Sequence, residues 1–82
     1  MTVIITAKKL SDTLEVVKGA KVNLSRDDVT ISGFTDNRGQ FRHTFDLQMQ
    51  LDVVATKDSL KGIGVVNMGE PGEDVNKTIY MF

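Results

Sequence analysis

Four oxygen-bearing side chains in two turns are the clearest candidates for chemistry in this chain. Asp27 and Asp28 share one turn, and Asp36 and Asn37 share the next. Carboxylate and amide oxygens are the ligands that Ca²⁺ prefers, so one hypothesis is a calcium site that gathers all four. Calcium takes about six to eight oxygens, however, and the ligand series of an EF-hand is absent. We therefore expect Asp36 and Asn37 to bend the backbone at a hairpin corner, with Gly39 supplying a positive φ, and we expect no metal or cofactor.

His43 is the only histidine and alternates with Phe41 and Phe45. A general base needs a nucleophile or water and an orienting group, and the local sequence supplies neither. Zinc would require further histidines or cysteines, and the chain has no cysteine. We expect His43 to lie on a buried face, bonded to the backbone, and we expect a protein that is not an enzyme.

The segment 69–74 gathers Glu70, Glu73 and Asp74 around the only proline. Glycine and proline explain a bend there, and the acidic groups make the loop a candidate contact for a basic protein partner. Tyr80 is the one tyrosine, and the chain has no tryptophan. Because sugar sites use exposed aromatic platforms, Tyr80 is the residue on which a carbohydrate- or surface-binding role would depend.

Composition and charge exclude several classes of partner. The 82 residues carry 10 basic and 11 acidic side chains, a formal net charge of −1. Near-neutrality offers no electrostatic footprint for nucleic acid. No apolar run approaches the roughly 20 residues that span a bilayer, so this segment is not expected to insert into a membrane. The first residues resemble no signal peptide. The oligomeric state is left open by the sequence.

Apolar residues recur at every second position along most of the chain. In the run 41–55, Phe41, His43, Phe45, Leu47, Met49, Leu51, Val53 and Ala55 alternate with polar residues. Successive side chains of a strand point to opposite faces, so this alternation predicts strands with one buried face. We break the run near residues 48–50 into two strands. The other predicted strands are 2–8, 20–25, 28–35, 62–68 and 74–82. Seven short strands with turns between them predict one domain over residues 1–82, an all-β, Ig-like or prealbumin-like antiparallel β-sandwich.

Three segments carry a resemblance to a known family. Residues 19–22 read Gly-Ala-Lys-Val, residues 35–41 read Thr-Asp-Asn-Arg-Gly-Gln-Phe, and Leu51, Val53 and Ala55 alternate in the strand that follows. This pattern resembles the carboxypeptidase regulatory-like domains, small sandwiches of the transthyretin-like group. The resemblance implies a non-catalytic accessory module of a bacterial secreted or cell-envelope protein, such as a lipoprotein. It implies an extracytoplasmic location and a role as a spacer or protein-interaction domain, with a partner protein or an adjoining domain of the same chain. The alternative is an adhesion domain that binds carbohydrate or a surface, with or without calcium.

Overall fold

The structure of the chain is a computed structural model and describes residues 2–12, 15–26, 29–44, 50–67 and 74–82. None of these residues lies in a helix. The strands are β1 (Thr2–Lys9), β2 (Lys21–Arg26), β3 (Val29–Phe34), β4 (Gln40–Thr44), β5 (Gln50–Lys57), β6 (Leu60–Asn67) and β7 (Val75–Met81). Within the described residues, strands lie where the period-two pattern predicted them, with ends that differ by one or a few residues. The predicted break near residues 48–50 lies largely outside the described residues.

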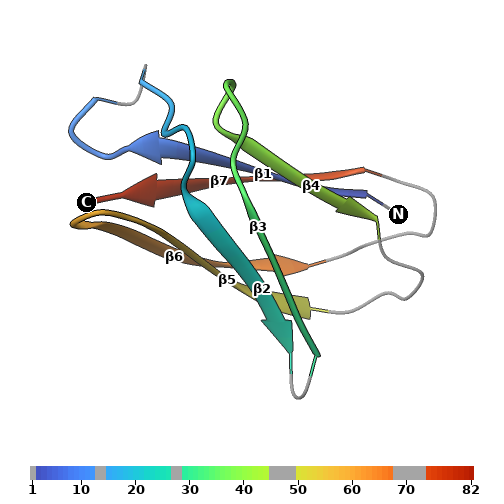
Figure 1. The fold of residues 1–82 in the computed structure, drawn as a ribbon. Helices are drawn as coiled ribbons and strands as arrows, with labels where there is room; N and C mark the ends of the chain where they lie inside the picture. Colours follow the sequence, from blue (N-terminus) through green and yellow to red (C-terminus); the bar gives the residue numbers. More distant parts are fainter. Residues whose placement is uncertain (1, 13–14, 27–28, 45–49, 68–73) are drawn as a thin grey trace.

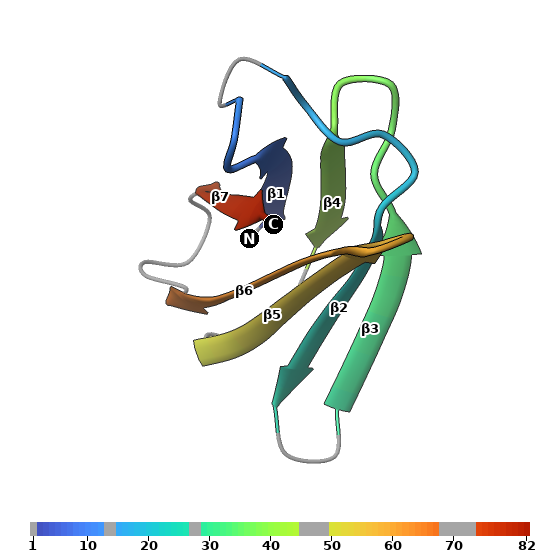
Figure 2. The same cartoon turned by 90° about the vertical axis from the view of Figure 1, so that its left-hand side faces the viewer.

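The strands form two sheets that pack face to face (Figures 1 and 2). One sheet has the order β4-β1-β7 and the other has the order β3-β2-β5-β6. The all-β sandwich predicted from the sequence is thus present. Its ladders are antiparallel except for β1 and β7, which pair in parallel from Val3↔Val75 to Lys9↔Met81. This pair corrects the expectation of a wholly antiparallel sandwich.

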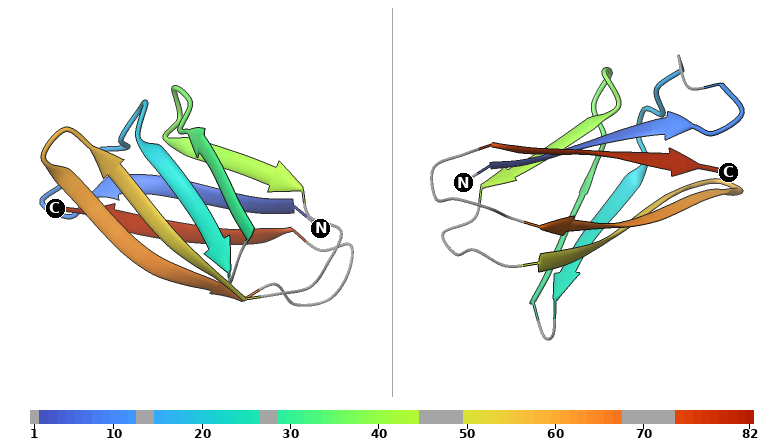
Figure 3. Two further views of the ribbon diagram at one scale, coloured as in Figure 1. Left: turned by 60° about the horizontal axis from the view of Figure 1, so that its bottom comes forward. Right: turned by 180° about the vertical axis from the view of Figure 1, so that it is seen from behind.

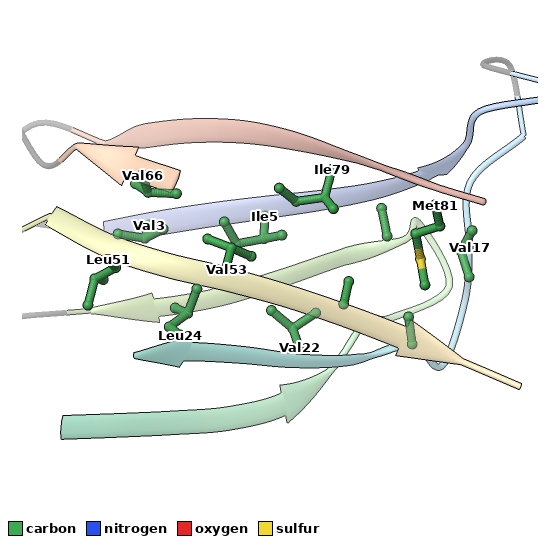
Figure 4. Close-up of a cluster of buried hydrophobic side chains, with 13 residues drawn as sticks. Val3, Ile5, Val17, Val22, Leu24, Leu51, Val53, Val66, Ile79 and Met81 are labelled. Carbon is green, nitrogen blue, oxygen red and sulfur yellow. The ribbon is translucent and has the colours of Figure 1, made fainter. Parts of the chain in front are cut away.

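The hydrophobic core lies between the sheets. In β1 the side chains of Val3, Ile5 and Ala7 are buried while the residues between them are not. The same alternation in the other sheet buries Val22 and Leu24 of β2 and Leu51, Val53 and Ala55 of β5. Figure 4 shows the valine, leucine and isoleucine side chains of this set pointing toward one another from both layers, with Ile79 and Met81 of β7 among them. Removing this apolar surface from water is the main stabilising contribution to a fold of this size.

The connection between β3 and β4 carries the chain from one sheet to the other. We predicted a hairpin corner here, but β3 and β4 are edge strands of different sheets and do not pair. The bend itself is as predicted: the amide of Gly39 donates to the carbonyl of Asp36 and the amide of Asp36 donates to the carbonyl of Gln40, each at 2.9 Å. Gly39 has a φ of 72°, in the left-handed region that glycine adopts without steric cost.

Strand β6 directs its glycines, rather than its larger apolar side chains, toward the core. Gly62 and Val66 are buried on the inner face, and Gly64 lies between them. Ile63 and Val65 occupy the opposite face and are exposed. The glycines leave room for β7: a β-carbon on Gly62 would lie 2.6 Å from the carbonyl oxygen of Tyr80, and one on Gly64 would lie 2.6 Å from Cδ1 of Ile79. Of the apolar residues Ile63, Val65 and Val66, only Val66 belongs to the core.

Candidate functional site

The segment Gly33 to Phe41, which carries the family-like motif, is a structural junction. Thr35 is 5% exposed, and its hydroxyl group donates to the carbonyl oxygen of Val17 at 2.7 Å and accepts from the amide of Ala20 at 2.9 Å. Its backbone bonds the same segment again, through Gly19 and Ala20. Thr35 thus fixes the chain that leads into β2 against the end of β3.

Asp36 closes the turn with its side chain. One carboxylate oxygen accepts hydrogen bonds from the amides of Arg38, at 2.8 Å, and Gln40, at 3.1 Å. These bonds, that of Gln40 first, favour the ionised form and hold the pKa of the Asp36 carboxyl below its ordinary value of 3.8. The carboxylate therefore acts as a cap for its own backbone, which is the structural role that the sequence favoured.

Glycines on either side of this turn allow close packing. A β-carbon on Gly33 would overlap the ring of Phe41, so the glycine leaves the space that the ring occupies. Gly39 is buried, and its carbonyl oxygen accepts from the amide of Ala7 at 2.8 Å. The motif residues are therefore explained by contacts within the fold.

The calcium candidates are not gathered in the described residues. Asp36 and Asn37 are exposed in the β3–β4 connection, while Asp27 and Asp28 lie outside the residues that the structure describes. The residues that flank that pair, Arg26 and Val29, oppose each other in the β2–β3 ladder at the end away from Phe34. Among the described residues, no group of three or more acids and histidines is arranged to hold a metal ion.

His43 lies on β4 in register with Val3 of β1 and is partly buried, on the same face as Phe41. It therefore occupies the core-facing register that its spacing predicted. A role in catalysis would need a nucleophile, a base and an oxyanion-stabilising group in one pocket. His43 lines neither the polar cavity beside Lys57 nor the shallow cleft beside Phe82.

The proposed interaction residues do not form one surface in the described structure. Asp74 is exposed just before β7, and Tyr80 is exposed near the other end of that strand. A strand rises about 3.3 Å per residue, so the two lie about 20 Å apart. Glu70 and Glu73 lie outside the described residues. Tyr80 is in register with Lys8 on the outer face of its sheet.

A polar cavity of about 360 Å³ lies where the loop after β1 meets the β5–β6 turn. Its lining residues are Lys9, Glu15, Val16, Val17, Lys18, Lys57, Asp58 and Leu60. Lys9 and Glu15 form an ion pair at 3.0 Å, and the ammonium group of Lys57 donates to the carbonyl oxygen of Lys18. The bond from Lys57 holds the loop against the end of β5, and the Lys9–Glu15 pair ties the loop to the end of β1, so these charges have a structural use.

An exposed apolar surface lies where β6 meets the end of β7. Phe82 and Lys61 exchange backbone hydrogen bonds, at 3.0 and 3.1 Å, which joins the two sheets at this point. Ile63 is 71% exposed and Phe82 is 75% exposed, and both line a shallow cleft of about 160 Å³ with Lys61 and Gly62. Val65 is the next outward residue of β6 and is 40% exposed. We call Ile63, Val65 and Phe82 the C-terminal apolar surface.

The sequence analysis did not predict this surface, although the alternation of residues 62–66 indicates which side chains share a face. Val66 shares its parity with Gly62 and Gly64, so a core-facing Val66 places Ile63 and Val65 outside. The choice between the two faces depends on β7, whose Ile79 fills the space over the glycines. No local pattern in residues 62–66 reveals that contact.

Among the described residues there is no helix with the length and apolarity to cross a membrane. No protein-family model matches this sequence, and no curated protein matches it significantly.

Proposed function

We propose that this chain is a non-catalytic β-sandwich module, of Ig-like or prealbumin-like type, that connects or docks proteins. In this proposal it belongs to a secreted or cell-envelope protein of a bacterium, as the resemblance of residues 19–22 and 35–41 to carboxypeptidase regulatory-like domains implies. The residues of the second segment support a scaffold role, because Thr35, Asp36 and Gly39 are engaged in bonds within the fold.

The observation that carries the proposal is the C-terminal apolar surface. Ile63 and Phe82 are large apolar side chains, more than two-thirds exposed, on one shallow cleft. Isolated exposed apolar residues are common on soluble proteins, but neighbouring ones with a polar surround are typical of protein contacts. Lys61 lies beside them and supplies a polar rim. An aromatic residue at such a position is a frequent source of binding energy.

The arrangement of the two ends supports a spacer role as well. Thr2 begins β1, whereas Phe82 follows the end of β7, next to the far end of β1 (Figure 1). The span of β1 separates these ends by about 23 Å along the strand. The molecule measures 34 Å along its longest axis. Domains attached at the two ends would be held apart on opposite sides of the sandwich.

Site-specific photo-crosslinking tests the docking role. A photoreactive phenylalanine analogue is placed at Ile63 or at Phe82 in the full-length protein, in the organism that makes it. A third version carries the analogue at Thr30, which is exposed on the outer face of β3. We expect positions 63 and 82 to form an adduct with the same protein or adjoining domain, identified by mass spectrometry, and position 30 to form none.

The companion variant is Phe82→Ser with the analogue kept at position 63. It should reduce the adduct yield at least about tenfold, the effect of losing one well-placed anchor. Equal adducts at positions 63, 82 and 30 would overturn the proposal, because they would indicate contact by collision alone. Adducts with glycan and none with protein would replace it with the adhesion role.

A further inference from the structure

Strand β6 is an edge strand with free backbone groups. It ends the four-stranded sheet and pairs with β5 through eight residue pairs, from Gln50↔Asn67 to Lys57↔Leu60, without a bulge. The N–H and C=O of Lys61 bond to Phe82, so they point away from β5. In an antiparallel ladder the backbone groups of successive residues point to opposite edges of the strand. Ile63 and Val65 lie two and four positions after Lys61, so their backbone groups also point away from β5. In the described part of the chain, the backbone hydrogen bonds of β6 on that side join Lys61 to Phe82.

Strand β7 leaves this edge open beyond Lys61. Figure 3 (right) shows β6 and β7 converging toward the C-terminus and separating toward their other ends. Ile79 reaches the inner face of β6 at the two glycines and does not pair with its edge. Among the described residues, therefore, none occupies this side of Ile63 and Val65, and an added strand would pair with their backbone groups.

Edge strands β3 and β4 carry polar residues at their centres, which discourages pairing there. The outward residues of β3 are Thr30 and Ser32, with the exposed Phe34 at its end, and β4 carries Arg42 at its centre. Natural edge strands are commonly protected by such polar or charged residues, by proline or by bulges. Strand β6 has none of these at its centre, where Ile63 and Val65 are exposed. Its one charged residue, Lys61, lies at the end that Phe82 already covers.

We propose that a second copy of this chain pairs with β6, antiparallel and about a twofold axis at Gly64. Ile63 of each copy then lies beside Val65 of the other, and each such pair exchanges both backbone hydrogen bonds. The outer faces of the two strands bring Ile63 and Val65 of both copies into one apolar cluster. The four-stranded sheets become one continuous sheet. This dimer rests on the proposed docking function, and it makes a second copy the partner of Ile63 and Val65 within the C-terminal apolar surface.

Charge does not oppose the pairing of β6 with itself. In this register the residue opposite Lys61 is the uncharged Asn67, so no like charges meet across the axis. The chain's net charge of −1 adds little repulsion between copies. Because Phe82 occupies the edge at Lys61, pairing is confined to the centre of the strand, and the contact is small. Small interfaces belong to weak, transient complexes, so we expect association in the range of about 0.1–1 mM.

The test uses the intact chain. Sedimentation equilibrium and ¹⁵N relaxation, from about 0.05 mM to about 2 mM, should show a monomer–dimer equilibrium. Val65→Lys should keep a dispersed spectrum and abolish association, whereas Thr30→Lys, a matched charge on the opposite edge strand, should leave association unchanged. In a mixture of isotopically different wild-type chains, nuclear Overhauser contacts between methyl groups of Ile63 and Val65 should join different copies, which requires no variant.

Each result decides the proposal. A wild-type monomer throughout the concentration range, or equal association of the Val65→Lys variant, would overturn it. Loss of association in Thr30→Lys as well would indicate a charge effect and would also overturn it. The proposed docking role is judged separately: a monomeric chain that still forms the specific adduct at positions 63 and 82 retains that role and loses only the second copy as its partner.

Discussion

The hydroxyl group of Thr35 donates a hydrogen bond to the carbonyl oxygen of Val17, 2.7 Å away and 18 positions earlier in the chain. The hydroxyl oxygen of Thr35 also accepts a hydrogen bond from the amide of Ala20. One buried side chain thus satisfies two backbone groups of a segment that has no strand of its own between β1 and β2. The first residue of the family-like segment 35–41 is thus used to hold the fold together.

Replacing Thr35 with Val should lower the free energy of unfolding by about 1–3 kcal/mol. The two side chains have nearly the same shape, but valine leaves the carbonyl of Val17 and the amide of Ala20 without their partner in a buried place. Thr35→Ser keeps the hydroxyl and should lose only about 1 kcal/mol, for the missing methyl group. Urea denaturation followed by circular dichroism gives both values. A valine variant as stable as the wild type would show that these bonds contribute little.

Gly19 and Gly39 offer a matched comparison, because both have a φ near 70°, at 66° and 72°. Alanine is strained in this region by about 1–2 kcal/mol wherever it is placed. A β-carbon on Gly19 would meet only the ammonium group of Lys57 at 3.8 Å, whereas one on Gly39 would lie 2.6 Å from Cβ of Val16 and 3.0 Å from the carbonyl oxygen of Ala7.

Gly39→Ala should therefore destabilise the protein by about 1–3 kcal/mol more than Gly19→Ala, since overpacking adds to the backbone strain. Thermal and urea denaturation of the two variants give the difference directly. Equal losses would mean that the segment around Val16 moves aside at no cost.

The strands were predictable because one buried face imposes a period of two on the sequence. The alternation from Val3 to Ala7 and from Leu51 to Ala55 is visible without any structure. The β5–β6 turn was also predictable, because it contains Asp58. Aspartate tolerates a positive φ, which is 51° here, better than most residues.

The arrangement of the strands could not be predicted in the same way. Whether β3 and β4 pair as a hairpin or separate into two sheets depends on partners far away in the chain, such as β1, which takes β4 as its neighbour. The parallel pairing of β1 with β7 is likewise a contact between the two ends of the sequence. The C-terminal apolar surface follows from the same kind of contact, because Ile79 decides which face of β6 is inside.

Gly62 and Gly64 should respond differently to alanine, although they lie two residues apart on the same face. At Gly62 the added methyl group would meet the backbone oxygen of Tyr80, which cannot move without β7, so we expect a loss of about 1–3 kcal/mol. At Gly64 it would meet Cδ1 of Ile79, the far end of a side chain that can change rotamer, and the loss should be under about 1 kcal/mol.

Hydrogen exchange supplies a second measurement for this pair. The amide of Phe82 donates to the carbonyl of Lys61 at 3.0 Å, so separating β7 from β6 should expose it. Gly62→Ala should increase its exchange rate by about 5- to 150-fold, as expected for a local loss of about 1–3 kcal/mol. Gly64→Ala should leave the rate near that of the wild type. Faster exchange of this amide in Gly64→Ala than in Gly62→Ala would contradict the packing of β7 against Gly62.

Acid should weaken the β3–β4 turn through Asp36. The amides of Gln40 and Arg38 lower the pKa of its carboxyl below 3.8, and an acid whose pKa is lower in the folded state stabilises that state while it is ionised. The contribution is therefore present above pH 3.8 and is lost as the pH falls through the lowered pKa. The stability advantage of the wild type over Asp36→Asn should shrink over that window, as urea denaturation at a series of pH values would show.

Side-chain carboxyl NMR measures the same effect at the residue itself. The titration midpoint of Asp36 should lie below 3.8 in the folded protein. In Arg38→Gln the midpoint should rise only slightly, because the backbone hydrogen bonds remain and they, more than the charge of Arg38, favour the carboxylate. A midpoint at 3.8 or above in the wild type, or complete loss of the shift in Arg38→Gln, would show that the turn is not closed by the Asp36 side chain.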